Sequence, residues 1–304
     1  MTSHAPAANR RQAMATETDQ FEDQRGLMFA IAYRMLGSVT EAEDILQDAY
    51  LRYRETPADT IVSPRAFLGT VVTRLCINQL QSARAQREVY IGPWLPEPLI
   101  TEVNDALSPA WRVDVDESIS MAFLVLLERL TPVERAVFLL REVFDYPYGE
   151  IAEIVGKEEA ACRQIFSRAK KALAAEQRPR FTPSGEQHRL IVQRFMQAVG
   201  AGNMEALIRL LADDATLWAD GGGKARGAAT RPLRGAGAVA RFAVGSLRFL
   251  ADPFEAELTE INGELAVILR NAGQPRVVVA FTLEHERIVE MRAIGNPDKL
   301  RHLP

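Results

Sequence analysis

Side chains that can contact DNA recur at helical spacing between residues 148 and 171. The sequence there, YGEIAEIVGKEEAACRQIFSRAKK, has small Ala152 where two helices would cross and Gly156 where the chain would turn, as a helix-turn-helix requires. Arginine and glutamine can make bidentate contacts with base edges, whereas serine and lysine suit phosphates. The members of this duplex set are Lys157, Glu158, Arg163, Gln164, Ser167, Arg168, Lys170 and Lys171. An amphipathic hairpin inside a helical bundle is the alternative.

A second group of hydrogen-bonding and cationic side chains lies between residues 65 and 87. They recur three and four residues apart with almost no acids among them, which suits a phosphate backbone and unstacked bases. The members of this single-strand set are Thr70, Thr73, Arg74, Asn78, Gln81, Arg84 and Arg87. Taken alone, they are equally compatible with a solvated helix face.

The segment before the single-strand set is acidic. It contains Glu41, Glu43 and the three members of what we name the acidic set, Asp44, Gln47 and Asp48. DNA would repel such a helix, so we expect it to face a basic protein partner, with solvation as the alternative.

Residues suited to catalysis or to metal binding are sparse. The histidines after residue 184 are His188, His285 and His302, and none falls in the middle of a predicted strand. Asp213 and Asp214 are predicted to end a helix. Cys76 and Cys162 lack the spacing of a zinc site or a disulfide framework. We expect no catalytic residue, no metal and no cofactor, and we expect that the protein is not an enzyme.

Composition and charge limit the classes of protein that remain. The 304 residues suffice for about two domains, and 47% hydrophobic and 25% charged residues are ordinary for a globular chain. No stretch is long and apolar enough to span a membrane, and the N-terminus lacks a signal peptide's apolar core, so we expect a cytoplasmic protein. The net charge of −4 is unevenly distributed, with basic stripes at 74–87 and 162–180 around an acidic connector at 100–118. This pattern predicts two DNA-facing surfaces held apart, and solvated helix faces are the alternative.

Periodicity and capping signals divide the first two thirds of the chain. Residues 1–20 are predicted to be a disordered tail. Three helices follow, at 21–37, at 40–53 with Thr40 and Glu43 as a capping box, and at 65–86 after Ser63-Pro64. The proline-rich GPWLPEPL at 92–99 excludes a helix, and its apolar residues predict an extended segment pinned to a surface. A second helical unit begins near Asp116 and includes a capping box at Thr131 and Glu134.

Beyond Ser184 the pattern changes. Two amphipathic helices, to residue 199 and at 204–211, precede a strand at 215–219 and a helix at 236–247. Strands are predicted at 254–261, 265–270, 276–283 and 288–294. Asn262-Gly263 between the first two is a strong hairpin signal. Helices followed by antiparallel strands predict an α+β domain.

Together these segments resemble a known family. Residues 21–90 resemble region 2, and 117–178 resemble region 4, of bacterial sigma factors in the short extracytoplasmic-function (ECF) architecture. The stretch TEAEDILQDAYLRYRE is similar to the helix that docks on the largest subunit of RNA polymerase, so the resemblance implies that the acidic set contacts core enzyme. It also implies that the single-strand set captures flipped-out bases of the −10 element and that the duplex set reads the −35 element. The sequence departs from the family pattern in the −10-reading region: Arg74 stands where asparagine is common, and Asn78 stands where aspartate is common.

Three further stretches resemble signatures of the ECF subgroup with a C-terminal SnoaL-like domain, group forty-one. They are GPWLPEPL at 92–99, DGGGK at 220–224 and NPDKL at 296–300. The resemblance implies that residues 184–304 form a cone-shaped α+β domain that contacts the linker at 91–116 and the sigma domains, and that regulates them in place of a separate anti-sigma protein. The residues it assigns to this contact are Trp94, Leu95, Pro96, Glu97, Asp220, Gly221, Gly222, Gly223, Lys224, Asn296, Pro297, Asp298, Lys299 and Leu300.

The sequence thus predicts a multidomain alternative sigma factor, with two all-α domains and a SnoaL-like regulatory domain. The expected partners are core RNA polymerase through its β and β′ subunits, promoter DNA and the chain's own C-terminal domain. A small-molecule ligand in the SnoaL-like pocket is a further candidate, and no membrane is expected. Lys224 is expected to meet Glu97 or the acidic connector. Two alternatives stay open: a stand-alone helix-turn-helix regulator with a ligand-sensing domain, and a SnoaL-type enzyme fused to a DNA-binding module.

Overall fold

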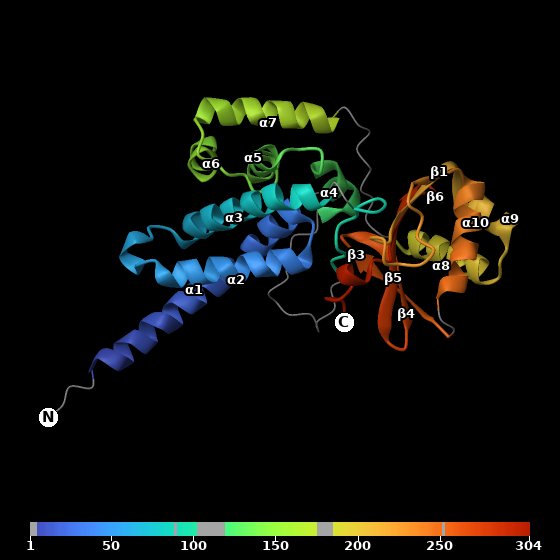
Figure 1. Cartoon of the computed structure of the whole chain (residues 1–304), viewed down its shortest axis with the longest axis horizontal. Helices are drawn as coiled ribbons and strands as arrows, with labels where there is room; N and C mark the ends of the chain where they lie inside the picture. Colours follow the sequence, from blue (N-terminus) through green and yellow to red (C-terminus); the bar gives the residue numbers. More distant parts are fainter. Residues whose placement is uncertain (1–4, 88–89, 102–118, 175–184, 251–252) are drawn as a thin grey trace.

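The structure of the protein is a computed structural model that describes residues 5–87, 90–101, 119–174, 185–250 and 253–304. For residues 5–19 and 83–87 it describes the backbone alone. The helices that precede residue 175 lie on one side of a curved sheet, and the helices of the C-terminal part lie on the other (Figure 1). The domain boundaries predicted near residues 116 and 178–184 lie outside the described residues. No described helix combines the length and the apolar character needed to span a membrane.

The first helical unit contains α1 (Ala5–Leu36), α2 (Val39–Glu55) and α3 (Pro64–Arg87), with a 3-10 turn, η1 (Ala58–Thr60), before α3. Two predictions here are wrong. The first helix begins at Ala5 and not near Phe21, so most of the expected disordered tail is helical. The second helix is capped by Ser38, whose hydroxyl accepts a hydrogen bond from the Glu41 amide, and not by a Thr40–Glu43 capping box.

The second helical unit contains α4 (Met121–Leu127), α5 (Pro132–Glu142), α6 (Tyr148–Val155) and α7 (Glu159–Ala174). The predicted capping box at Thr131 and Glu134 is confirmed, with both hydrogen bonds formed. Gly156 ends α6 with φ of 65°, a left-handed conformation that favours glycine, so the turn of the helix-turn-helix is confirmed. On α7, buried Cys162, Ile165 and Ala169 face back toward the unit.

One continuous apolar core runs through both helical units. It joins Met28 and Leu46 of the first unit to Phe138 and Ile151 of the second. The Arg135 guanidinium on α5 also donates a hydrogen bond to the Met35 carbonyl at the end of α1, over 2.6 Å. The two units therefore pack as one body.

The C-terminal part has helices α8 (Glu186–Gly200), α9 (Met204–Leu210) and α10 (Ala236–Ser246), and 3-10 turns η4 (Leu247–Phe249) and η5 (Pro297–Lys299). Its described residues form the strands β1 (Leu211–Asp220), β2 (Leu233–Arg234), β3 (Glu255–Ile261), β4 (Glu264–Asn271), β5 (Gln274–Glu284) and β6 (Arg287–Ile294), in the order β2-β1-β6-β5-β4-β3. Strands β3 to β6 form the predicted antiparallel meander, and β1 joins β6 in parallel. The predicted α+β architecture is present. Asp213 and Asp214 lie inside β1, so the prediction that they end a helix is wrong.

Both faces of this sheet are buried, as the apolar run LAVIL in β4 requires. Successive side chains of a strand point to opposite faces. Val267 and Leu269 join the core against α8 to α10, whereas Ile268 joins a separate cluster with Leu95 and Met121. The helical units and the linker thus cover the second face.

Candidate interdomain latch and DNA-facing surfaces

The carboxylate of Asp220 lies at the centre of the contact between the linker and the C-terminal domain. Asp220 ends β1 and is fully buried. One oxygen accepts hydrogen bonds from the Leu95 amide at 2.8 Å and the Lys299 Nζ at 2.7 Å, and the other accepts one from the Tyr90 hydroxyl. A buried carboxylate is costly unless it is paired and fully hydrogen-bonded, and these donors satisfy it.

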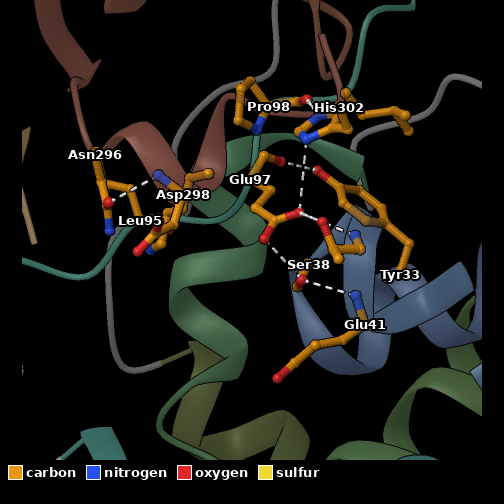
Figure 2. A network of polar contacts seen from close by, with 12 residues as sticks. Tyr33, Ser38, Glu41, Leu95, Glu97, Pro98, Asn296, Asp298 and His302 are labelled. Atoms are coloured by element: carbon orange, nitrogen blue, oxygen red, sulfur yellow. Dashed lines mark hydrogen bonds and ion pairs between the residues drawn. The ribbon is translucent and has the colours of Figure 1, made fainter. Parts of the chain in front are cut away.

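The NPDKL stretch closes over the linker from the other side. Buried Lys299 also donates to the Leu95 carbonyl, and its ammonium lies 4.3 Å from the centroid of the Trp94 ring. The Asn296 amide donates to the Tyr90 hydroxyl over 2.9 Å. The Asn296 side-chain carbonyl caps η5 by accepting from the Asp298 amide (Figure 2). The NPDKL stretch therefore contacts both the backbone of the linker, at Leu95, and two of its side chains, Tyr90 and Trp94.

Glycines in the DGGGK stretch permit this close approach. Gly222 and Gly223 have φ of 55° and 72°. A Cβ on Gly222 would collide with the Asn296 amide, and one on Gly223 would lie 2.8 Å from Ile91. We name the contact formed by Tyr90, Trp94, Leu95, residues 220–224 and residues 296–300 the latch. All three signature stretches of the sequence meet in it.

The expectation that Lys224 meets Glu97 is wrong, because its ammonium pairs with Asp298 of the NPDKL stretch. Residues 102–118 of the acidic connector, the alternative partner, lie outside the described residues. The DGGGK stretch follows β1 and the NPDKL stretch follows β6, and these two parallel strands end at the same edge of the sheet. The ion pair therefore joins two neighbouring loops of the C-terminal domain. Glu97 points the opposite way, toward the first helical unit.

Glu97 ties the linker to the start of α2. Its carboxylate accepts hydrogen bonds from the Ser38 hydroxyl at 2.9 Å and the Thr40 amide at 3.0 Å, where the helix N-terminus favours an anion (Figure 2). The Tyr33 hydroxyl donates to the Glu97 carbonyl over 2.7 Å, and His302 lies on the other side with Nδ1 3.8 Å from the carboxylate. The linker is thus gripped by the C-terminal domain at Leu95 and by the first helical unit at Glu97.

The hairpin between β3 and β4 adds a contact that the sequence did not reveal. Asn262 is fully buried with φ of 55°. Its amide nitrogen donates to the Tyr33 hydroxyl at 2.7 Å and the Ile119 carbonyl at 2.8 Å, and its oxygen accepts from the Leu99 amide at 3.0 Å. One side chain therefore joins both helical units and the linker. The only sequence signal was the Asn-Gly turn, which specifies the hairpin but not its partners.

Glu264, two residues further on, docks the start of α4. Its carboxylate accepts from the Met121 amide at 3.3 Å and from the Thr282 hydroxyl at 3.1 Å. Burial raises the pKa of Glu264, while Arg292, 3.8 Å away, opposes that rise. The second face of the sheet thus contacts both helical units through buried polar groups.

The duplex set lies together on α7 and the turn before it. All of its members are exposed. Two of their charges are engaged within the chain: Arg163 pairs with Glu159 and stacks on Tyr148, and Lys170 lies 2.9 Å from Glu142. Such exposed pairs are weak and can be exchanged for phosphate or base contacts.

The single-strand set is only partly brought together. Asn78 and Gln81 are exposed on α3, but Thr73 is buried, and the Thr70 hydroxyl is bonded to the Ala66 carbonyl. Arg74 contacts the second helical unit, where its guanidinium donates to the Glu153 carbonyl at 2.7 Å and the Ile154 carbonyl at 2.9 Å. The side chains of Arg84 and Arg87 lie outside the described residues. In this arrangement the buried Thr73 side chain is not accessible to DNA, whereas Arg74 is exposed with its guanidinium engaged by the second helical unit.

The acidic set is presented to solvent. Asp44, Gln47 and Asp48 are exposed on α2, and the intervening Ile45 and Leu46 point into the core. This arrangement leaves a charged helix face free for a partner.

Comparisons with known proteins place these features in a family. Residues 21–86 match the family model "Sigma-70 region 2", and residues 120–173 match "Sigma-70, region 4". The ECF RNA polymerase sigma factor SigJ of Mycobacterium tuberculosis is 39% identical over 299 residues, which cover 95% of this chain and 94% of SigJ. The chain belongs to the ECF RNA polymerase sigma factors. The probable ECF sigma factor SigI of the same species is 34% identical over 189 residues, which cover 62% of this chain and 64% of SigI.

The likeness to SigJ extends to its three-dimensional structure. The crystal structure of M. tuberculosis SigJ, 36% identical, superimposes with a TM-score of 0.72 and covers 93% of this chain and 97% of that chain. The predicted fold, two helical sigma domains and a SnoaL-like α+β domain, is confirmed. The protein is an alternative sigma factor that binds core RNA polymerase and directs promoter-specific initiation. This membership decides against the stand-alone regulator.

Proposed function

We propose that the SnoaL-like domain regulates this sigma factor by holding its two sigma domains in a closed arrangement. The latch carries the proposal: buried Asp220 and Lys299 hold Leu95 of the linker, while Glu97 of the same linker is bonded to the start of α2. Burial of Leu95, which is 1% exposed, contributes about 2 kcal/mol to this contact. The appended domain therefore acts on the segment that connects the two sigma domains.

The contact between α3 and α6 supports the closed arrangement. Arg74 of the proposed −10 reader is bonded to carbonyls at the end of α6, in the proposed −35 reader. Elements centred at −10 and −35 are 25 base pairs apart, about 85 Å along straight duplex at 3.4 Å per base pair. The two sigma domains must separate to reach both elements, and release of the latch would permit this.

The remaining roles follow from the resemblance and from the exposed surfaces. Asp44, Gln47 and Asp48 are the proposed contact to the β′ subunit, with further contacts to β. Residues 157–171 are proposed to read the −35 duplex, and residues 70–87 the −10 element. We propose that the chain has no active site of its own, because the polymerase carries out phosphodiester chemistry, and that it works in the cytoplasm. A small-molecule ligand in the SnoaL-like domain is part of the proposal.

The test compares latch variants of the full chain. Asp220→Asn removes the charge that pairs with Lys299, and Asp213→Asn removes an exposed charge from the same strand as a control. Dyes on cysteines at exposed positions 62 and 172 report the separation of α3 from α7 by energy transfer. We expect Asp220→Asn to lower energy transfer in the free chain and to change run-off transcription at limiting core enzyme several-fold. Unchanged transfer and transcription, beside a lowered melting temperature, would show that the latch only stabilises the fold.

A further inference from the structure

The SnoaL-like domain encloses a cavity of about 400 Å³ between its sheet and the helices α8 and α10. Pockets of about 300–1,000 Å³ are typical of small-molecule sites. Its walls are apolar: Phe195 and Phe242 come from the helices, and Val279 and Met291 from the sheet. A ligand that fills this space must therefore present a mainly apolar body.

Positive charge gathers at the rim of the cavity. Arg226 and Arg276 line it and are exposed. Among the described residues neither guanidinium has a hydrogen-bond or ion-pair partner. Lys224 lines the cavity beside them but pairs with Asp298, and the carboxylate of Asp220 is occupied within the latch. Two unpaired arginines beside an apolar cavity are complementary to an anion.

We propose that the cavity binds an amphipathic organic anion, an apolar chain or ring system that carries one carboxylate or a similar group held by Arg226 and Arg276. This inference rests on the proposed regulatory function and names the class of its ligand. The apolar body lies between the sheet and α8 and α10, and the anionic group stays at the rim, where water partly solvates it.

The cavity shares a wall with the latch. Asp220, Lys224, Pro297 and Leu300 line the cavity, and Leu300 also belongs to the apolar cluster that receives Leu95. An anion beside Arg226 offers Lys224 a second partner in place of Asp298, which loosens η5 over the linker. A ligand shifts an equilibrium by the difference in its affinity for the two states. The anion therefore favours the open latch.

Calorimetry with the full-length chain tests the ligand class. The probes are decanoate and decan-1-ol, which have the same chain and differ in charge. We expect decanoate to bind at least tenfold more tightly than the alcohol. Arg226→Ala/Arg276→Ala should remove that preference and keep alcohol binding, whereas Arg194→Ala/Arg241→Ala, which changes exposed arginines outside the cavity, should bind like wild type. Ala243→Phe, which fills the cavity, should bind neither probe. Equal decanoate affinity in wild type and in the rim variant, or no binding to wild type, overturns the proposal.

The energy-transfer pair at positions 62 and 172 separates this inference from the proposed function. Decanoate should lower transfer in wild type and leave it unchanged in the rim variant. If Asp220→Asn opens the chain but decanoate neither binds nor changes transfer, the ligand proposal fails and the latch stands. If decanoate binds through the rim arginines while neither the ligand nor Asp220→Asn changes transfer, the regulatory function fails.

Discussion

The side-chain nitrogen of Asn262 lies 2.7 Å from the hydroxyl oxygen of Tyr33, although 229 positions of the chain separate the two residues. Tyr33 is on α1 of the region 2 domain, and Asn262 is at the tip of a hairpin in the SnoaL-like domain. Burial raises the pKa of Tyr33, so the phenol stays neutral, accepting from Asn262 and donating to the Glu97 carbonyl. Both residues are fully buried, which makes this bond a direct link between the appended domain and the sigma domains.

Asn262→Asp tests this link. Aspartate tolerates the left-handed backbone but cannot donate to Tyr33 and Ile119, and it places a charge in a buried site. We expect the free energy of unfolding to fall by about 3 kcal/mol and amide exchange in residues 92–101 to accelerate. Denaturant unfolding and hydrogen exchange measure these effects. Asn271→Asp, in the neighbouring hairpin, is the control. An unfolding midpoint equal to that of the control would contradict the assigned role.

Glu264 should give the stability a pH dependence. A carboxyl with a raised pKa in the folded state binds its proton more tightly there than in the unfolded chain. Ionisation of Glu264 therefore opposes folding. This free-energy cost decreases as the pH falls through the folded-state pKa toward the ordinary pKa of a glutamate. We expect wild type to gain stability relative to Glu264→Gln between pH 7.5 and pH 5, as measured by urea unfolding. The stability of the exposed control Glu257→Gln should show the same pH dependence as that of wild type. If the stability of Glu264→Gln also showed the wild-type pH dependence, the pKa of the Glu264 carboxyl would not be raised in the folded state.

Arg74→Ala should loosen the closed arrangement before any DNA is present. The change removes two charge-assisted hydrogen bonds to the end of α6, so we expect the contact between α3 and α6 to weaken by about 2 kcal/mol. Energy transfer between positions 62 and 172 in the free chain should fall, while Arg52→Ala on exposed α2 should leave it unchanged. If Arg74 served only as a DNA ligand, transfer in the free chain would match wild type.

The duplex set should separate into reading and anchoring residues. Arg163→Ala should reduce discrimination of the −35 sequence by about 1–3 kcal/mol. Lys170→Ala should weaken binding to all sequences alike and lower the salt slope by about 1. Titrations of holoenzyme on cognate and scrambled −35 promoters across a salt series measure both effects. Equal losses on the two promoters for Arg163→Ala would count against its assignment.

The sequence predicted those features that local patterns encode. The capping box at Thr131, the left-handed Gly156 and the Asn262-Gly263 hairpin each depend on residues a few positions apart, and each was correct. The residues of the latch were predicted because the family resemblance assigned all three signature stretches to one interdomain contact.

Features that depend on distant partners could not be predicted. Local spacing does not reveal that Arg74 contacts α6, that Lys224 pairs with Asp298, or that Asn262 reaches Tyr33. The cap of α2 differs from the predicted one for the same reason: the Thr40 amide and hydroxyl are bonded to Glu97 of the linker, and Ser38 caps the helix.

The separation of the two sigma domains is the most direct measure of the central claim. Energy transfer between dyes at positions 62 and 172 should be high in the free chain, where α3 contacts α6. It should fall sharply when the same chain joins core polymerase on promoter DNA, and fall partly in Asp220→Asn without any partner. Transfer that stays the same in the free chain, in Asp220→Asn and in the promoter complex would contradict a latch that opens.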